Sequence, residues 1–439
     1  MSSDMTTERA GSVAHKDTAA VVRAGLQRRY RAERRFKLYG LAGVAIALLF
    51  LAFLFGSIIS KGYTAFWLTE LKLTVHLSEQ RIDPQGTRDP DVLRRAYYQG
   101  LVRTAMSEML PGTRGRQATR ELDRMVSPAA GFKLRRMVMD NPDLIGTTQT
   151  LWVPASDDID MLRKGYISRD VPESERRVTD RQLRWLDKLA ADGLVRGTFN
   201  WRFFANSASR EPEIAGIWGA VVGSALTLAV TLALSFPLGV MTAIYLEEFA
   251  PRNKWTDLIE VNINNLAAVP SIIFGLLGLA VFLNFFGLPR SAPLVGGLVL
   301  TLMTLPTIII SARSALRSVP PSIREAALAM GASPLQAVTH HVFPLALPGM
   351  LTGTIIGMAQ ALGETAPLLM IGMVAFVSGV PSGLTDSATV LPVQIYLWSG
   401  SAEVAYVERT AAAIMVLLAF LVLMNATAVI LRKRFEVRW

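Results

Sequence analysis

The sequence predicts an all-α membrane protein with six transmembrane helices and one inserted α+β domain. Two observations carry this prediction. Only 18% of the 439 residues are charged and 51% are hydrophobic, whereas an average soluble protein carries about 25% charged residues. The apolar residues are also gathered into charge-free runs, several of which exceed the roughly 20 residues that a helix needs to cross a bilayer. These observations exclude an ordinary soluble enzyme, and the absence of cysteine excludes disulfides, thiolate metal sites and a cysteine nucleophile.

The first apolar run, residues 38–60, lies between Lys37 and Lys61. It is too long for the apolar part of a signal peptide and has no small-residue cleavage site, so we expect a retained helix. Five further runs follow after a long gap, at 214–246, 261–289, 291–312, 345–377 and 410–431. Each is predicted to be helical, because lipid offers no hydrogen-bond partner to an unpaired backbone group.

The distribution of basic residues predicts the orientation of these helices. Lysine and arginine gather in the tails 1–37 and 432–439 and in the loops 247–260 and 313–344. The two short loops on the opposite face hold little more than Arg290 and Arg409. By the positive-inside rule both termini are cytoplasmic. The net charge of +10 is then largely a matter of topology, and we expect contact with membrane lipid and none with nucleic acid.

Residues 61–213 form a single insertion with dense charge of both signs, predicted to be a compact extracytoplasmic α+β domain. Leucine and valine alternate with polar residues from Leu71 to Leu77, as in a half-buried strand. Further strands are expected at 148–153 and 194–201, and helices at 91–110 and 172–191. Nothing in the insertion indicates catalysis, since His76 is isolated and the acids at 157–160 are typical of a helix N-terminus rather than a metal site.

Residues 320–349 lie between the fourth and fifth runs and have strong helix signals. Pro321 suits the first position of a helix that ends at Gly331. Ser333 can then cap a second helix that begins at Pro334. We therefore predict two short helices joined by a glycine on the cytoplasmic face.

This stretch resembles the EAA loop of ABC-importer permeases, whose pattern is Glu-Ala-Ala, three residues, Gly, nine residues and Ile-x-Leu-Pro. The matching positions here are Glu325, Ala326, Ala327, Gly331 and Pro344. His341 and Phe343 stand where the family usually has Ile and Leu. The resemblance implies a permease core over 214–431 whose loop docks into a groove of an ATP-hydrolysing subunit, with Glu325 offering a charge-assisted contact. The alternative is an amphipathic loop resting on lipid headgroups.

The chain lacks the phosphate-binding loop that ATP hydrolysis would need. It contains no Gly-x-x-x-x-Gly-Lys-Ser/Thr pattern and no Gly-Lys dipeptide. We therefore expect a transport subunit that is not an enzyme and binds no cofactor, with ATP–Mg held by a partner dimer of ATP-binding subunits.

Small residues recur every four positions in the fifth run, at Gly349, Gly353, Gly357 and Ala361. Such a face lets two helix backbones approach closely in lipid. It is predicted to pack either against a second permease or within this chain, and the sequence does not decide between the two.

Glu364 is the single acid of the fifth run. An intramembrane carboxylate costs about 2.5–3.5 kcal/mol and normally faces a partner or a water-filled path. The run is longer than one span requires, and Gly363 and Pro367 bracket the acid, so we predict a tilted or broken helix that lines a cavity. With Gln360 and Thr365, Glu364 is the candidate for the translocation pathway.

Residues 363–369 (GETAPLL) and 269–280 (VPSIIFGLLGLA) resemble the PstA-type permeases of bacterial phosphate importers, over about 214–439. The resemblance implies import of inorganic phosphate across the bacterial inner membrane by alternating access. It also implies three kinds of partner: a second homologous permease, an ATP-binding subunit dimer and an extracytoplasmic phosphate-binding protein. Such permeases often have an arginine one turn before the glutamate, where this chain has Gln360. Glu364 would accept a hydrogen bond from protonated phosphate or pair with an arginine of the second permease.

One alternative belongs to the same class of function and two belong to other classes. A permease for sulfate or molybdate would carry the same loop. A membrane sensor could use the inserted domain, although sensors usually carry a larger cytoplasmic signalling part than tails of this length. A membrane enzyme would want paired intramembrane acids or an HExxH motif, and the runs hold only Glu364.

Overall fold

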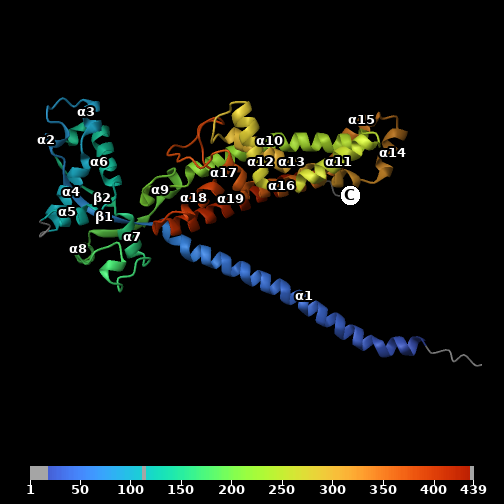
Figure 1. The fold of residues 1–439 in the computed structure, drawn as a ribbon, viewed down its shortest axis with the longest axis horizontal. Helices are drawn as coiled ribbons and strands as arrows, with labels where there is room; N and C mark the ends of the chain where they lie inside the picture. Colours follow the sequence, from blue (N-terminus) through green and yellow to red (C-terminus); the bar gives the residue numbers. More distant parts are fainter. Residues whose placement is uncertain (1–17, 111–114, 436–439) are drawn as a thin grey trace, which may run out of the picture. The chain divides into compact units, whose positions relative to one another are not determined.

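The computed structural model describes residues 18–110 and 115–435. It divides into two units, residues 1–57 and 58–439. The first unit holds most of α1 (Thr18–Gly62), which contains the predicted first span, 38–60. The described part of the predicted N-terminal tail, from Thr18 onward, is helical and continuous with that span (Figure 1). Residues 1–17 of the tail and 436–439 at the other end lie outside the described residues.

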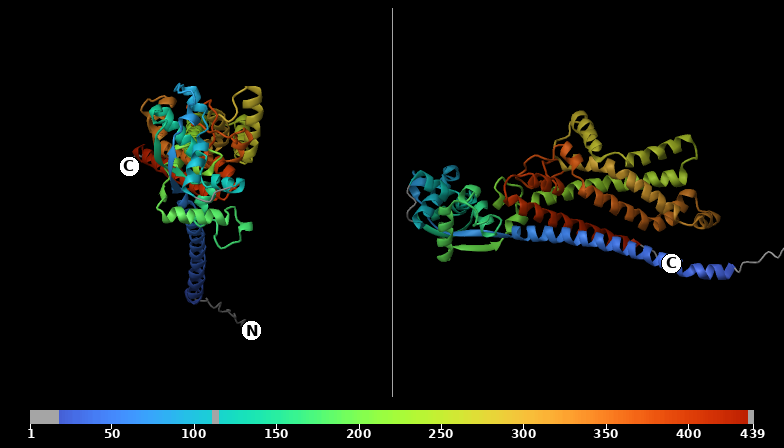
Figure 2. Two further views of the ribbon diagram at one scale, coloured as in Figure 1. Left: turned by 90° about the vertical axis from the view of Figure 1, so that its left-hand side faces the viewer. Right: turned by 60° about the horizontal axis from the view of Figure 1, so that its bottom comes forward.

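Four long apolar helices form the bundle of the second unit: α10 (Trp218–Ile244), α13 (Pro293–Arg317), α16 (Phe343–Gly363) and α19 (Ala405–Phe435). α13 packs along both α10 and α16, and α19 packs along α16 (Figure 2). A π-helical segment, η5 (Tyr245–Phe249), extends α10. With α1, these helices are long and apolar enough to make five membrane crossings in the part of the chain that the structure describes.

The run at 261–289 is not the single helix that was predicted. It consists of α11 (Lys254–Ala267), α12 (Ser271–Gly278) and the π-helical η6 (Leu279–Phe285), and the two halves are bent by 101°. The bend follows from Pro270, which disfavours a helical conformation in the residue before it and cannot donate a backbone hydrogen bond. If this bent pair is counted as one span, the described residues hold six.

The predicted break at Glu364 is confirmed. α16 ends at Gly363, Glu364 itself is extended (φ −77°, ψ 127°), and the short helix α17 (Ala366–Met370) follows. Beyond it lies a helix that the sequence analysis missed, α18 (Leu391–Ser399). Arg409, predicted to lie in a short loop, lies inside α19 and is 1% exposed.

The inserted residues form an α+β region around an antiparallel sheet of order β2-β1-β3, which confirms the three predicted strands. They are β1 (Trp67–His76), β2 (Thr148–Pro154) and β3 (Val195–Phe199). In register, Leu73 of β1 faces Leu151 and Leu71 faces Val195. The apolar side chains that alternate along β1 are buried against the surrounding helices.

The helices of this region differ in detail from the prediction. The expected helix at 91–110 is two helices, α3 (Pro90–Arg95) and α4 (Tyr98–Met109), and α8 (Asp180–Ala191) begins later than expected, at a capping box on Thr179. The other helices are α2 (Glu79–Ile82), α5 (Arg116–Asp123), α6 (Ala129–Asp140), α7 (Asp157–Arg163) and α9 (Trp201–Ala205). The 3-10 turns are η1 (Tyr63–Phe66), η2 (Pro142–Leu144), η3 (Glu173–Glu175) and η4 (Pro212–Ile214).

Candidate functional site

The two predicted helices between α13 and α16 are present and are called here the elbow, residues 321–337. α14 (Pro321–Ala329) is followed by Gly331 at a φ of +90°, a backbone conformation that any residue other than glycine adopts only with strain. Ser333 then caps α15 (Pro334–Ala337). Its Oγ accepts a hydrogen bond from the backbone N–H of Gln336, and the side-chain Oε1 of Gln336 accepts one from the backbone N–H of Ser333.

The predicted loop 313–344 is shorter than expected at both ends. α13 continues through Arg317, and from Pro334 the chain is helical through α15 and the π-helical η7 (Val338–Val342) into α16. Pro344 therefore lies inside a helical span rather than in a loop. It lines a cleft of about 580 Å³ together with the residues that connect α13 to α14 and with Ile323 of α14.

The elbow exposes apolar side chains beside its glutamate. Ala327 is buried against the bundle, whereas Glu325 and Ala326 are exposed. Leu328, Met330 and Leu335 are also exposed, Met330 to 89%. An exposed apolar group of this kind, next to an exposed carboxylate, is typical of a surface that a partner covers.

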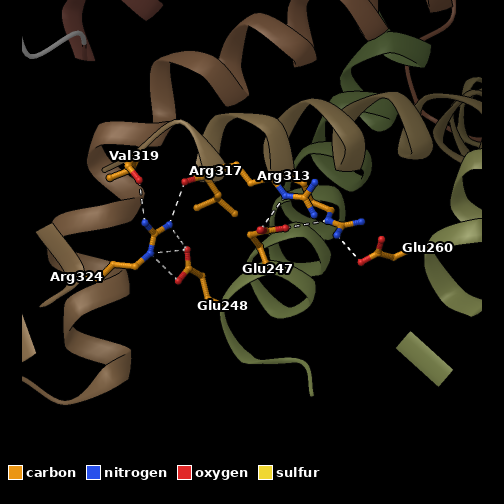
Figure 3. Close-up of polar contacts among 8 residues, drawn as sticks. Glu247, Glu248, Glu260, Arg313, Arg317, Val319 and Arg324 are labelled. Carbon is orange, nitrogen blue, oxygen red and sulfur yellow. Dashed lines mark hydrogen bonds and ion pairs between the residues drawn. The ribbon is translucent and has the colours of Figure 1, made fainter. Parts of the chain in front are cut away.

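A network of three glutamates and three arginines holds the elbow to the bundle (Figure 3). In its first half, Arg313 and Arg317, one turn apart on α13, both bind Glu247 of η5, the segment that extends α10. The Nε of Arg317 lies 2.8 Å from Glu247 Oε1. Arg313 also contacts Glu260 of α11, which joins the bent pair of helices to the same network.

In its second half, Arg324 of α14 binds Glu248, the neighbour of Glu247 (Figure 3). Its Nε lies 3.0 Å from Glu248 Oε2, and its Nη1 and Nη2 donate to the carbonyls of Val319 and Leu316, at 2.9 and 3.0 Å. The side chain of Glu248 is 8% exposed. A guanidinium with four such acceptors has little freedom, so the first turn of the elbow is fixed to α10 and α13.

Sequence reasoning missed these pairs because it used the arginines only as markers of orientation. Glu247 and Glu248 end one apolar run, and Arg313 and Arg317 end another. The opposite charges at the ends of these two runs were the signal from which the ion pairs could have been predicted. In the structure, the positive charge of these arginines is balanced by glutamates of the same chain.

The small-residue face of α16 packs within this chain. A Cβ built on Gly353 would lie 2.1 Å from Ser311 of α13, and one built on Gly349 would lie 2.7 Å from Ala315. Gly357 lies against Ile308, and Ala361 is buried. Of the two interpretations left open by the sequence, the structure has the one in which α16 contacts α13.

Glu364 lies at the break between α16 and α17 and is half-buried. Its carboxylate has no hydrogen-bond or ion-pair partner within 18–110 and 115–435. Thr365 is half-buried beside it, and Gln360, one turn earlier, is exposed. The three candidates thus share one end of α16, but nothing in the described chain neutralises the acid. No cluster of three or more metal-ligating side chains occurs among the same residues.

Apolar spans, a broken helix and an elbow with an exposed apolar surface define a multi-pass membrane protein of the transport-permease class. Comparison with known proteins agrees. The family described as binding-protein-dependent transport system inner membrane component matches residues 235–437, and a domain of unknown function, DUF3333, matches 23–173. A Bacillus subtilis protein, the probable ABC transporter permease YqgH, is 30% identical over 217 residues, covering 48% of this chain and 68% of the relative. The chain belongs to this family of ABC transporter permeases and is not the ATPase subunit.

Other relatives carry more specific names. The probable ABC transporter permease YqgI of Bacillus subtilis is 35% identical over 39% of this chain and 58% of the relative. The phosphate transport system permease PstA of Mycobacterium leprae is 33% identical over 39% of this chain and 56% of the relative. The chain thus spans just over half the length of these two relatives. A solved inward-facing structure of the MetNI methionine ABC transporter covers 50% of this chain and 98% of its own at 21% identity, with a TM-score of 0.39.

Proposed function

We propose that this chain is the membrane-spanning subunit of an ATP-driven importer that moves inorganic phosphate across the bacterial cytoplasmic membrane. In this proposal it spans the membrane six times, the bent pair α11–α12 counting as one span, and both termini are cytoplasmic. The α+β region then lies on the outer side, and the elbow lies on the cytoplasmic side, where ATP is available.

The observation that carries this proposal is the exposed apolar surface of the elbow. Leu328, Met330 and Leu335 are open to contact next to Glu325, while Arg324 fixes the start of the elbow to the bundle. A partner that binds this surface can therefore move α10 and α13, because the elbow is attached to both helices. That is the mechanical property that alternating access requires of a permease driven by a separate ATP-binding dimer.

The choice of phosphate rests on relatives named as phosphate transport permeases and on the residues around Glu364. A carboxylate can accept a hydrogen bond from a phosphate that still carries a proton, while it repels oxyanions that carry none. Glu364 lacks a partner among the described residues, so it is free to serve this role or to pair with an arginine of a second permease. An extracytoplasmic phosphate-binding protein would deliver the substrate.

Uptake of radiolabelled phosphate into a strain that lacks its own phosphate permease tests the substrate. Expression of this chain with its partner subunits is expected to restore uptake that unlabelled phosphate suppresses. Suppression by sulfate or molybdate instead would assign the chain to another oxyanion. Failure of the ATP-binding subunits to co-purify with this chain would contradict its proposed role in an ATP-driven importer.

A further inference from the structure

A cavity of about 460 Å³ lies between α6 of the α+β region and the segment that leads into α10. One face of α6 forms its floor and carries Lys133 and Arg136. Arg202 of α9, Asn206 and Ile214 form the opposite wall. The cavity is remote from the elbow and from Glu364 in the sequence, and the proposed transport cycle makes no use of it.

The cavity has an excess of positive charge. Lys133, Arg136 and Arg202 line it together with one carboxylate, Asp140. Behind the lining, the carboxylate of Glu70 joins Arg202 to a fourth cation, Arg196. Glu70 is buried and is shared between the cations: Arg196 Nη2 lies 2.7 Å from its Oε2, and Arg202 Nη2 lies 3.9 Å from its Oε1. Four cations against two carboxylates leave a charge of +2.

Arg202 has a donor that this charge arrangement leaves unsatisfied, and the charge of Lys133, whose Nζ donates to the carbonyl of Trp152 at 2.6 Å, is disfavoured. The buried Nη1 of Arg202 has no hydrogen-bond partner among the residues that the structure describes. Burial lowers the pKa of Lys133, and the nearby guanidinium groups of Arg202 and Arg196 lower it further, against the opposing effect of Glu70. A buried donor without an acceptor is costly, and an anion in the cavity would satisfy it.

The cavity lies at the level where a membrane span begins. The carbonyl of Asn206, which lines the cavity, accepts from the N–H of Trp218, the first residue of α10. The carbonyl of Phe203 in α9 accepts from the N–H of Ile217. These bonds hold α9 at the end of a helix that crosses the bilayer, which is the depth at which lipid phosphates lie.

An exposed aromatic surface accompanies the cavity at this level. It consists of Trp67, Phe199, Trp201 and Phe204, and Trp201 is 72% exposed. The rings contact one another, with 4.7 Å between the centroids of Phe199 and Trp201. Trp67 directly follows the first membrane span, which ends at Phe66. Aromatic side chains are enriched at the membrane–water interface, where an apolar ring sits among the headgroups.

We propose that the cavity between α6 and α9 binds a phosphate group, and that this phosphate belongs to the headgroup of an anionic phospholipid. The aromatic surface decides between a lipid and free phosphate, because it places the acyl chains of the outer leaflet beside the cavity. Arg136, Lys133 and Arg202 hold the phosphate oxygens. The bound lipid thus fixes the α+β region against the bilayer at the start of α10.

Native mass spectrometry of the full-length chain, purified in detergent and titrated with phosphatidylglycerol, tests the proposal. The parent is expected to retain phosphatidylglycerol in preference to phosphatidylcholine. Arg202→Gln and Lys133→Gln each remove a charge-assisted hydrogen bond, so each is expected to weaken retention about tenfold. Arg136→Gln is expected to act in the same direction. Because Arg136 is exposed and has no ion pair in the described chain, this variant keeps the test valid if Arg202→Gln misfolds.

Arg95→Gln is the matched control, since Arg95 is exposed on α3, is not among the residues that line the cavity and has no ion pair in the described chain. It is expected to retain the lipid as the parent does. Equal retention by Arg136→Gln, Lys133→Gln and the control would overturn the proposal. A different result would also overturn the lipid assignment. If millimolar inorganic phosphate displaced the lipid from the parent, and Arg202→Gln, Lys133→Gln and Arg136→Gln all bound that phosphate more weakly, the cavity would be assigned to the free ion.

Discussion

Lys164 of the α+β region is paired with Glu408 of α19, with 2.8 Å between its Nζ and the Oε1 of the carboxylate. The same Nζ lies 2.6 Å from Oδ2 of Asp160, whose other oxygen accepts from the backbone N–H of Thr69 in β1. All three charged side chains are less than a tenth exposed. The sheet, α7 and α19 thus meet at one buried ammonium group, which joins the inserted region to the bundle.

Lys164→Met is expected to lower the stability of the chain by about 3–5 kcal/mol, because it leaves two buried carboxylates without a counter-charge. Adding Glu408→Gln to this variant removes one of them and is expected to recover part of the loss. Thermal unfolding of the purified chain measures both effects. Lys188→Met is the control, since Lys188 is exposed on α8. A loss no larger in Lys164→Met than in the control would contradict the structural role of the pair.

Glu213 makes the stability of the chain depend on pH. It is 2% exposed in η4, and burial raises its pKa from 4.5 to about 7. Between these values the folded chain holds a proton that the unfolded chain has released, so stability falls as pH rises from about 4.5 to about 7. At about 1.4 kcal/mol for each pH unit, the total is about 3 kcal/mol.

Glu213→Gln removes this titration, so its apparent Tm is expected to change less between pH 5 and pH 8 than that of the parent. Differential scanning fluorimetry of both proteins in the same detergent measures the difference. Parallel pH profiles would show that Glu213 does not titrate in this range.

Arg324 is expected to transmit movement of the elbow to the bundle. Arg324→Gln loses the bond to Glu248 and the bonds to the Val319 and Leu316 carbonyls, whereas Glu248→Gln loses only the ion pair. Both variants should reduce transport-coupled ATP hydrolysis by the assembled complex, and Arg324→Gln should do so more. A double-mutant cycle is expected to give a coupling energy of about 0.5–3 kcal/mol. Arg252→Gln, an exposed arginine in the turn before α11, should hydrolyse ATP like the parent; a matching loss there would indicate a general charge effect.

The features that could be predicted from the sequence are those that depend on a local pattern of residues. Charge-free length placed the spans, alternation placed β1, and Gly331 and Ser333 placed the elbow, because each signal acts over a few residues. The partners of Glu248, Lys164 and Arg202 could not be predicted, since each joins segments far apart in the chain. The single helix expected at 261–289 was wrong, because the apolar composition of the run outweighed the helix-breaking signal of Pro270.

Gly331→Ala separates the role of the elbow from backbone strain. A Cβ at Gly331 meets nothing within 4 Å in this chain, so the cost within the chain is the strain of a φ of +90°, about 1–2 kcal/mol. Gly146→Ala is a matched control in the α+β region, with a φ of +87° and equally open space. Both should lower the Tm similarly, but only Gly331→Ala should reduce co-purification with the ATP-binding subunits. Equal co-purification of the two variants would count against the elbow as the docking surface.

Glu364→Gln tests the two roles left open for the unpartnered carboxylate, because it removes the charge and keeps the size of the side chain. If Glu364 pairs with an arginine of a second permease, the variant should lose assembly with that subunit, since a buried arginine left without its partner is costly. If Glu364 accepts a hydrogen bond from protonated phosphate, assembly should persist, while phosphate uptake falls and competition by sulfate rises. Assembly and uptake equal to the parent at every phosphate concentration would exclude both roles and remove Glu364 from the translocation pathway.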